Sequence, residues 1–170
     1  MDLRSYIRDI PDFPKPGILF RDITPLLRDA DALASTIEQL AERASDLDFD
    51  LIAGIESRGF VFATALAVRM SRGLIPIRKP GKLPFRTHRQ EYQLEYGTDA
   101  VEIHQDAIEP GTGILLVDDL LATGGTMGAA CRLVQHSGGR VAGCQFVIEL
   151  SALGGRAKLP DVPLESLITY

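Results

Sequence analysis

The segment ILLVDDLLATGGTMGAA, residues 114–130, combines an apolar run, two acids and a loop rich in glycine and other small residues. The run from Ile114 to Val117 predicts a buried strand, and a helix is expected to begin at Gly124 or Gly125. A glycine-rich loop that enters a helix presents several backbone N–H groups to one point, where the helix dipole adds positive potential. This segment therefore predicts a phosphate cradle between a strand and a helix.

The loop and the two acids of this segment suit different parts of one ligand. The threonine hydroxyls can add donors to the cradle, and the paired glycines let the backbone approach a phosphate without a Cβ in the way. The acids would repel a phosphate, because an ionised carboxylate accepts hydrogen bonds and donates none. We therefore expect them to bind ribose hydroxyls and to face positive charge on the sugar ring. The residues expected to hold a ribose 5-phosphate are Asp118, Asp119, Ala122, Thr123, Gly124, Gly125 and Thr126, and we call residues 122–126 the phosphate loop.

Apolar periodicity over the rest of the chain alternates between helix and strand. Helices are expected over residues 31–45, 58–70 and from 124 or 125 to 137, and short strands over residues 51–55, 74–77, 114–117, 141–148 and 164–169. Strands that alternate with helices imply a mostly parallel sheet flanked by helices. We therefore predict an α/β fold in a single domain over residues 1–170, with ligands bound beyond the carboxyl ends of the strands.

Two segments depart from this alternation. PDFPKPG, residues 11–17, has three prolines and a glycine and is expected to form an extended arm. Residues 79–90, KPGKLPFRTHRQ, are basic and turn-rich, and residues 91–96 and 100–105 then alternate apolar and polar side chains. The alternation predicts a two-stranded β-ribbon that protrudes as a flap. An edge hairpin without a function is the alternative.

The composition excludes several classes of protein. The 170 residues carry a net charge of −5, so a protein that presents a basic face to duplex DNA is not expected. No apolar run approaches the ~20 residues of a membrane span, and residues 1–10 lack the pattern of a secretory signal. Cys131 and Cys144 are expected to be small buried hydrophobes in a reducing compartment. We therefore expect a cytoplasmic protein with no nucleic-acid and no membrane partner.

Residues 114–130 resemble the PRPP-binding motif of the type I phosphoribosyltransferases, where PRPP is phosphoribosyl pyrophosphate. Four more segments match that family in order and spacing: PDFPKPGILFRDITPLL at 11–27, GIESRGF at 54–60, RKPGKLP at 78–84 and LEYG at 94–97. In its form, VDDLLATGGTM is similar to the members that act on adenine. The resemblance implies the type I phosphoribosyltransferase fold, with a small N-terminal hood over the base (residues 11–27) and a flexible loop and flap (residues 79–105) that close over PRPP.

The resemblance also implies roles for residues outside the phosphate loop. Adenine is expected to be gripped in the hood, by ring stacking and backbone groups, and to be touched from its other face by one leucine. The residues implied for adenine are Leu19, Phe20, Arg21 and Leu120. The residues implied for pyrophosphate are Glu56, Ser57, Arg58, Arg78, Lys79 and Lys82. On the flap, Glu95 matches a glutamate that handles the proton on the purine, and Tyr96 follows it.

The activity that the resemblance implies is purine salvage, in which the 5-phosphoribosyl group of PRPP is transferred to N9 of adenine, giving AMP and pyrophosphate. The ribose becomes oxocarbenium-like as pyrophosphate leaves. Arg58 and Lys82 are expected to stabilise the leaving group, and Glu95 to act as a general acid or base on the purine. Mg²⁺ is expected to arrive bound to PRPP, since no Cys/His cluster has metal-ligand spacing. The resemblance also implies a homodimer.

Three other interpretations of the sequence are open. The same fold could act on hypoxanthine, guanine, xanthine or orotate, although residues 19–21 and 94–97 argue against these bases. A non-catalytic PRPP sensor that regulates transcription would need a DNA-binding module, for which we expect no spare residues. A fragment similar to a PRPP synthetase would need an ATP site, and we expect none. The glycine-rich loop of residues 114–130 is neither a GxxxxGK[ST] loop nor a GxGxxG dinucleotide fingerprint. Residues 85–90, which include His88, match no pattern and receive no role.

Overall fold

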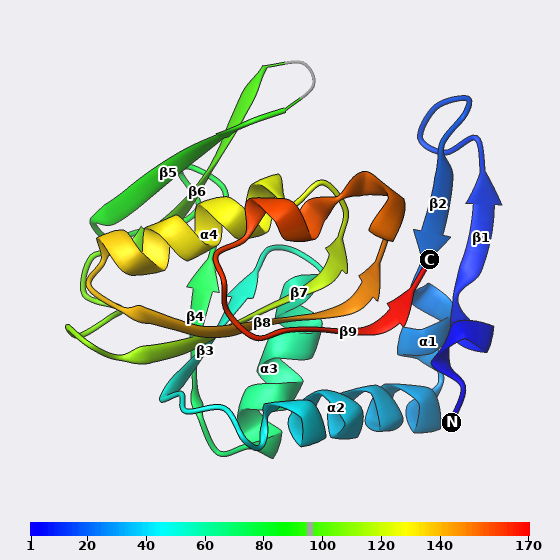
Figure 1. The fold of residues 1–170 in the computed structure, drawn as a ribbon, viewed down its shortest axis with the longest axis horizontal. Helices are drawn as coiled ribbons and strands as arrows, with labels where there is room; N and C mark the ends of the chain where they lie inside the picture. The colour runs from blue at the N-terminus through cyan, green and yellow to red at the C-terminus, as the bar shows by residue number, and fades with distance from the viewer. Residues whose placement is uncertain (95–96) are drawn as a thin grey trace.

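The computed structural model describes residues 1–94 and 97–170, so the flap residues Glu95 and Tyr96 lie outside the described residues. Within the described part of the chain, the main sheet has five strands, all parallel, in the order β4-β3-β7-β8-β9 (Figure 1). These strands are β3 (Leu51–Ile55), β4 (Gly73–Ile77), β7 (Gly113–Leu121), β8 (Arg140–Glu149) and β9 (Leu164–Thr169). The predicted α/β fold with a mostly parallel sheet is confirmed.

Helices cover both faces of the main sheet. On one face lie α2 (Ala30–Ala44) and α3 (Gly59–Arg69), and on the other lies α4 (Gly125–His136). Helix α2 begins where it does because Asp29 caps it, with the Asp29 side chain accepting a hydrogen bond from the N–H of Ala32 at 2.9 Å. All three helices begin and end within one residue of the limits that periodicity predicts.

The central strand β7 divides the core into two layers. Leu115 and Val117 pack on the side of α2 and α3, whereas Ile114 and Leu116 pack on the side of α4, and all four side chains are fully buried. Burial of one such side chain contributes roughly 1.5–3 kcal/mol before the entropic cost of folding. Because both faces of the strand are covered, residues 114–117 are continuously apolar rather than alternating.

The predicted end of this strand at Val117 is wrong. Strand β7 runs on to Leu121, so Asp118 and Asp119 lie inside the strand and only residues 122–124 separate it from α4. The reason is the neighbouring strand β8, which continues beside it and pairs Asp118 with Phe146 and Leu121 with Glu149. Pairing with a long neighbour keeps the backbone extended where the side chains alone predicted a loop.

The predicted ribbon is present but begins earlier than expected. Strands β5 (Thr87–Gln93) and β6 (Thr98–His104) pair in antiparallel register, from Thr87 with His104 to Gln93 with Thr98. The basic, turn-rich segment predicted for residues 79–90 therefore gives its last four residues to the ribbon. The two strands pack against α4.

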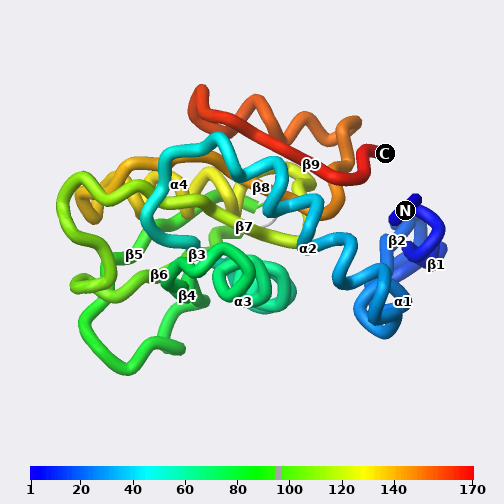
Figure 2. The backbone as a smooth tube through the Cα atoms, turned by 90° about the horizontal axis from the view of Figure 1, so that it is seen from below, coloured from blue at the N-terminus to red at the C-terminus, as the bar shows by residue number. Residues whose placement is uncertain are grey.

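The N-terminal segment forms a second small ribbon. Strand β1 (Arg8–Pro11) pairs with β2 (Leu19–Asp22) in antiparallel register. The prediction of an extended arm at residues 11–17 is wrong, because Pro11 ends β1 and residues 12–18 turn back as the loop of the hairpin. The 3₁₀ turn η1 (Leu3–Tyr6) precedes this hairpin and the short helix α1 (Thr24–Arg28) follows it. Figure 2 shows the hood and the β5–β6 flap at opposite ends of the molecule. None of the helices in the described residues is long and apolar enough to cross a membrane.

Candidate functional site

The carboxyl ends of β3 and β7 bring two of the sequence motifs together. The strands pair in parallel, with Leu51 opposite Ile114 and Gly54 opposite Val117. The segment that follows β3 therefore emerges beside the two acids of β7, and the Nε–H of Arg58 donates a hydrogen bond to Oδ2 of Asp119 at 2.5 Å. Asp119 is buried, whereas the Arg58 side chain is 44% exposed and can reach a ligand.

Helix α3 begins directly against the acids. A Cβ on Gly59 would lie 2.7 Å from Oδ1 of Asp118, closer than real Cβ atoms approach. Only glycine lets the first turn of α3 pack at this distance. The backbone N–H groups at the start of that helix consequently lie beside the strand end that carries the acids.

Asp118 lies half-buried beside the charge of Asp119. Its Oδ1 accepts a hydrogen bond from the N–H of Asp119 at 2.8 Å. Burial and then the neighbouring Asp119 carboxylate raise the pKa of Asp118 well above its ordinary value, and the Asp119 N–H and then Arg58 offset only part of that shift. The site therefore holds a carboxyl group whose charge is disfavoured in the empty protein.

The phosphate loop encloses a small cavity between β7 and α4. Gly124 adopts a left-handed backbone conformation with φ of 79°, which a side chain would strain. The cavity has a volume of about 80 Å³. It is lined by Asp118, Leu120, Leu121, Ala122, Thr123, Gly124, Gly125, Thr126 and Met127, which include every residue predicted for ribose 5-phosphate except Asp119.

Two of the cations predicted for pyrophosphate, Arg78 and Lys79, bond to the carboxylate of Glu56. Nε–H of Arg78 donates to Oε2 of Glu56 at 3.0 Å, and the other carboxylate oxygen of Glu56 accepts the N–H of Lys79 at 2.6 Å. The carbonyl of Lys82 accepts a longer bond from Arg78 at 3.4 Å. Glu56 thus accepts bonds from a guanidinium and a backbone N–H, so its geometry suits holding Arg78 in place rather than touching an anion itself.

Two ribbon residues that the sequence analysis missed join this group. Lys79 donates to Asp99 on β6 and, at 2.8 Å, to the hydroxyl of Tyr92 on β5, and Thr126 of the phosphate loop donates to the same hydroxyl at 3.2 Å. Burial opposes the charge of Lys79, but the bonds to Asp99 and Tyr92 outweigh it and raise the pKa of Lys79. No local sequence signal marks these partners, because strand pairing alone brings them to Lys79.

The hood residues predicted to grip adenine differ in their surroundings. Leu19 is 45% exposed, and the Phe20 ring lies edge-on to Phe13 with 5.1 Å between ring centroids. The guanidinium of Arg58 lies 5.6 Å from the Phe20 ring centroid, so the hood approaches the segment after β3. Arg21 instead pairs with Asp9, and its guanidinium stacks on an aromatic ring that lies outside the hood.

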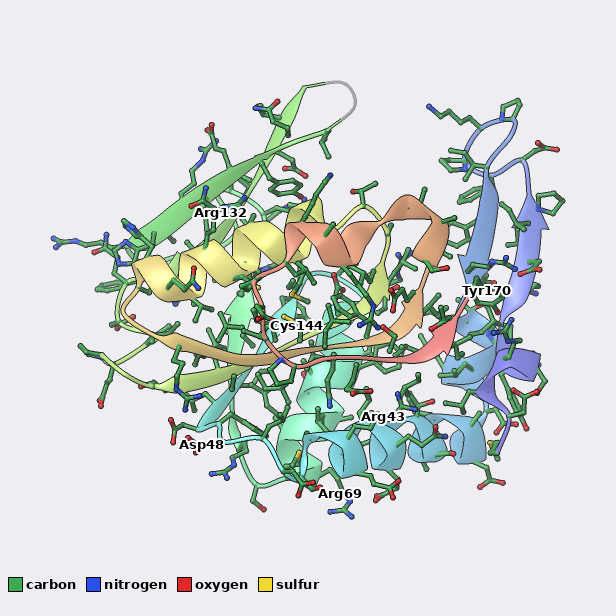
Figure 3. The ribbon with its side chains drawn as sticks, in the orientation of Figure 1. Arg43, Asp48, Arg69, Arg132, Cys144 and Tyr170 are labelled. Carbon is green, nitrogen blue, oxygen red and sulfur yellow. The ribbon has the colours of Figure 1, made fainter. Side chains whose placement is uncertain are left out.

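That ring belongs to Tyr170, which Figure 3 labels beside the hood at the end of β9. The guanidinium of Arg21 lies 3.8 Å from the Tyr170 ring centroid, and that of Arg4 lies 4.5 Å from it. The Arg21 side chain is therefore engaged in fastening the hood to the main sheet. In this arrangement, only the backbone of Arg21 is available to contact a base.

Comparison with known proteins identifies the class to which this fold and site belong. Residues 22–161 match the family model described as the phosphoribosyl transferase domain. The chain belongs to the phosphoribosyl transferase family.

Similar sequences and structures extend over the full chain. The adenine phosphoribosyltransferase of Trichormus variabilis is 58% identical over 100% of both chains, and that of Thermosynechococcus vestitus is 56% identical with the same coverage. The crystal structure of adenine phosphoribosyltransferase from Thermoanaerobacter pseudethanolicus superposes with a TM-score of 0.97 at 51% identity, covering 99% of this chain and 98% of that one. The enzyme from Saccharomyces cerevisiae, in complex with adenine and an imino-altritol bisphosphate, gives 0.92 at 38% identity and covers 98% and 96%.

The raised pKa of Asp118 predicts that this carboxylate lowers the stability of the empty protein. Above its folded pKa the group is charged at a cost, and below the unfolded value of about 3.9 it is protonated in both states. Asp118→Asn keeps the acceptor for the Asp119 N–H and removes the charge. We expect the variant to be more stable than the parent at pH 7, with the gain vanishing as the pH falls to about 4, as measured by urea unfolding.

Exposed Asp46→Asn is the matched control and should leave stability unchanged at both pH values. An Asp118→Asn variant that is less stable than the parent at pH 7 would contradict the inferred direction of the shift.

Proposed function

We propose that this chain transfers the 5-phosphoribosyl group of PRPP to N9 of adenine, giving AMP and pyrophosphate. The observation that carries the proposal is the junction at the ends of β3 and β7, where a phosphate loop, an acid pair and Arg58 lie within one small region. Full-length relatives named adenine phosphoribosyltransferase support it at up to 58% identity.

PRPP binds, in this proposal, with its three charged or polar parts on three parts of the junction. The 5′-phosphate enters the phosphate loop, where backbone N–H groups and the start of α4 favour an anion. Asp118 and Asp119 accept hydrogen bonds from the ribose hydroxyls. The pyrophosphate lies toward four basic side chains. Arg58 follows β3, and Arg78, Lys79 and Lys82 lie between β4 and β5.

The reaction is displacement at the anomeric carbon. The bond from that carbon to pyrophosphate oxygen breaks first, N9 of adenine forms the new bond, and the N9 proton passes to a base. Arg58 and Lys82 stabilise charge on the departing pyrophosphate, and the two aspartates face the positive charge on the ribose ring. We assign the proton to Glu95, a proposal that rests on the LEYG match because Glu95 lies outside the described residues.

Mg²⁺ belongs to this proposal as part of the substrate. Across residues 1–94 and 97–170, no three His, Cys, Asp or Glu side chains gather as they would around a metal ion, and Glu56 and Asp119 are paired with arginines. That donor set suits a Mg²⁺ held mainly by oxygens of PRPP and water. Bound to PRPP, the ion neutralises part of the pyrophosphate charge.

The base is proposed to lie between the hood and the end of β7. The Phe20 ring supplies a flat apolar surface, the backbone of residues 19–21 supplies hydrogen bonds to the edge of the base, and Leu120 contacts its other face. The complex of the Saccharomyces cerevisiae relative with adenine supports adenine as the base. The free thiols of Cys131 and Cys144, both buried, suit the reducing cytoplasm in which we place the protein.

A homodimer is part of the same proposal. Val61 and Val68 lie seven residues apart on one side of α3 and are 41% and 77% exposed, and Leu74 on the neighbouring edge strand β4 is 38% exposed. A partly apolar surface beside a free strand edge suits a second copy of the chain.

Light scattering after size exclusion should therefore give twice the chain mass of 18.5 kDa. Val68→Glu should shift the protein toward monomer because it buries a charge in the interface, whereas Leu153→Glu, at a residue that is 50% exposed away from α3, should not. A parent protein that is monomeric at micromolar concentration would refute the dimer.

The choice of base is tested by offering adenine, hypoxanthine, guanine and orotate separately, with Mg²⁺ and PRPP. We expect AMP and pyrophosphate from adenine alone, since the hood is proposed to form an adenine site. Product from another base would be consistent with the proposed phosphate loop but would refute an adenine site at residues 19–21. PRPP binding without any product would favour the alternative of a non-catalytic PRPP sensor.

The role of the flap glutamate is tested by Glu95→Gln. The variant keeps the shape of the side chain and removes the proton acceptor, so turnover should fall by about 10²–10⁴-fold. Single-turnover kinetics on the parent would establish that chemistry is rate-limiting. Undiminished turnover under that condition would remove Glu95 from the mechanism.

A further inference from the structure

The segment GGRAK at residues 154–158 has no part in the site as proposed, yet it packs directly behind the phosphate loop. We call residues 154–158 the back turn; it comprises Gly154 and the 3₁₀ turn η3 (Gly155–Lys158). A Cβ on Gly155 would lie 2.4 Å from the carbonyl oxygen of Ala122 and 3.1 Å from the N of Gly124. Gly155 is buried, so no solvent gap exists into which a side chain could turn.

The contact is reciprocal and extends along the first turn of α4. A Cβ on Gly124 would lie 2.3 Å from the carbonyl oxygen of Gly155, and a Cβ on Gly128 would lie 3.1 Å from that of Lys158. Residues four apart lie on one side of a helix, so this side of the GGTMG segment meets the back turn as backbone against backbone. The small cavity enclosed by the phosphate loop does not include Gly155 in its lining.

The back turn is itself fixed to the main sheet. Arg156 donates two hydrogen bonds of 2.7 Å to the carboxylate of Glu149, which is the last residue of β8 and only 4% exposed. The hydroxyl of Ser166 on β9 donates to the same carboxylate at 2.7 Å. The bidentate pair and the burial of its acid give the turn a defined position that a surface loop would lack.

We propose that Gly155 is a positioning residue that sets the backbone of the phosphate loop for the 5′-phosphate of PRPP and AMP. The inference rests on the proposed function, because it takes that loop as the 5′-phosphate site. The loop has two adjacent glycines, whose backbone is free to adopt many conformations, so its N–H groups converge only if contacts around it fix the backbone. The back turn supplies that support, and a methyl group at position 155 displaces the Ala122 carbonyl and the N–H groups that follow it.

The test compares two neighbouring glycines with opposite surroundings. Gly155→Ala adds a methyl group where no space exists, whereas Gly154→Asn adds a side chain at a position with φ of 64° and nothing within 4 Å, a conformation that asparagine tolerates. Binding of AMP, ribose 5-phosphate and pyrophosphate would be measured by calorimetry, together with the KM for PRPP. Thermal unfolding would be followed in parallel.

For Gly155→Ala we expect AMP and ribose 5-phosphate to bind about 10–100-fold more weakly, as for a displacement of catalytic or binding groups by less than about 1 Å. Pyrophosphate, which has no 5′-phosphate, should bind as to the parent, and Gly154→Asn should match the parent in all three. Parent-like AMP affinity in folded Gly155→Ala would overturn the proposal. Equal losses for AMP and pyrophosphate would overturn it as well, because they indicate general damage.

Arg156→Lys keeps the inference testable if Gly155→Ala does not fold. Lysine retains the charge opposite buried Glu149 but cannot form the bidentate pair, so the back turn loosens without an unpaired acid. AMP should bind several-fold more weakly and pyrophosphate unchanged, and parent-like AMP affinity would overturn the proposal. If the parent itself binds AMP but forms none from adenine and PRPP, the proposed function fails while the binding comparison still decides the role of Gly155.

Discussion

The parallel hydrogen bonding of β3 to β7 is the constraint on which the site depends. It fixes the ends of two strands side by side, so that the arginine after one strand meets the acids within the other. The helix after β3 must then begin in contact with β7, and the glycine at position 59 makes that contact sterically possible. Gly54 in β3 likewise lets α3 pack closely one helical turn further on, because a Cβ there would lie 2.6 Å from the side chain of Ala63.

Local pattern was sufficient for the architecture because each layer is marked by its own periodicity. The amphipathic stripe of α2 and the apolar runs of β3 and β4 predicted elements whose limits differ little from those observed. The strand end at Val117 was wrong because acids normally mark a loop, and only the pairing with β8 keeps residues 118–121 extended. The ribbon began early for a similar reason, since Thr87 to Gln90 become a strand by pairing with residues 101–104.

The site was predictable only where it is contiguous in sequence. The phosphate loop is one such stretch, and its residues lie around one cavity. The partners of Lys79 and Arg156 could not be predicted from local sequence, because strand pairing and turns bring Asp99, Tyr92 and Glu149 to them. The roles of Glu95 and Tyr96 stay predictions from the resemblance.

One property of the predicted pyrophosphate region concerns its charge before any ligand arrives. Arg58, Arg78 and Lys79 each have a carboxylate partner, in Asp119, Glu56 and Asp99, and the three cationic side chains are between 35% and 44% exposed. In two of these pairs a partly exposed arginine meets a largely buried acid, since the side chains of Asp119 and Glu56 are 9% and 11% exposed. The carboxylates act as built-in counter-ions to the three cations, so the empty region presents little net positive potential to solvent. An abundant simple anion such as chloride gains little there, and encounter with a polyanion owes less to long-range attraction than it would at an uncompensated basic cleft.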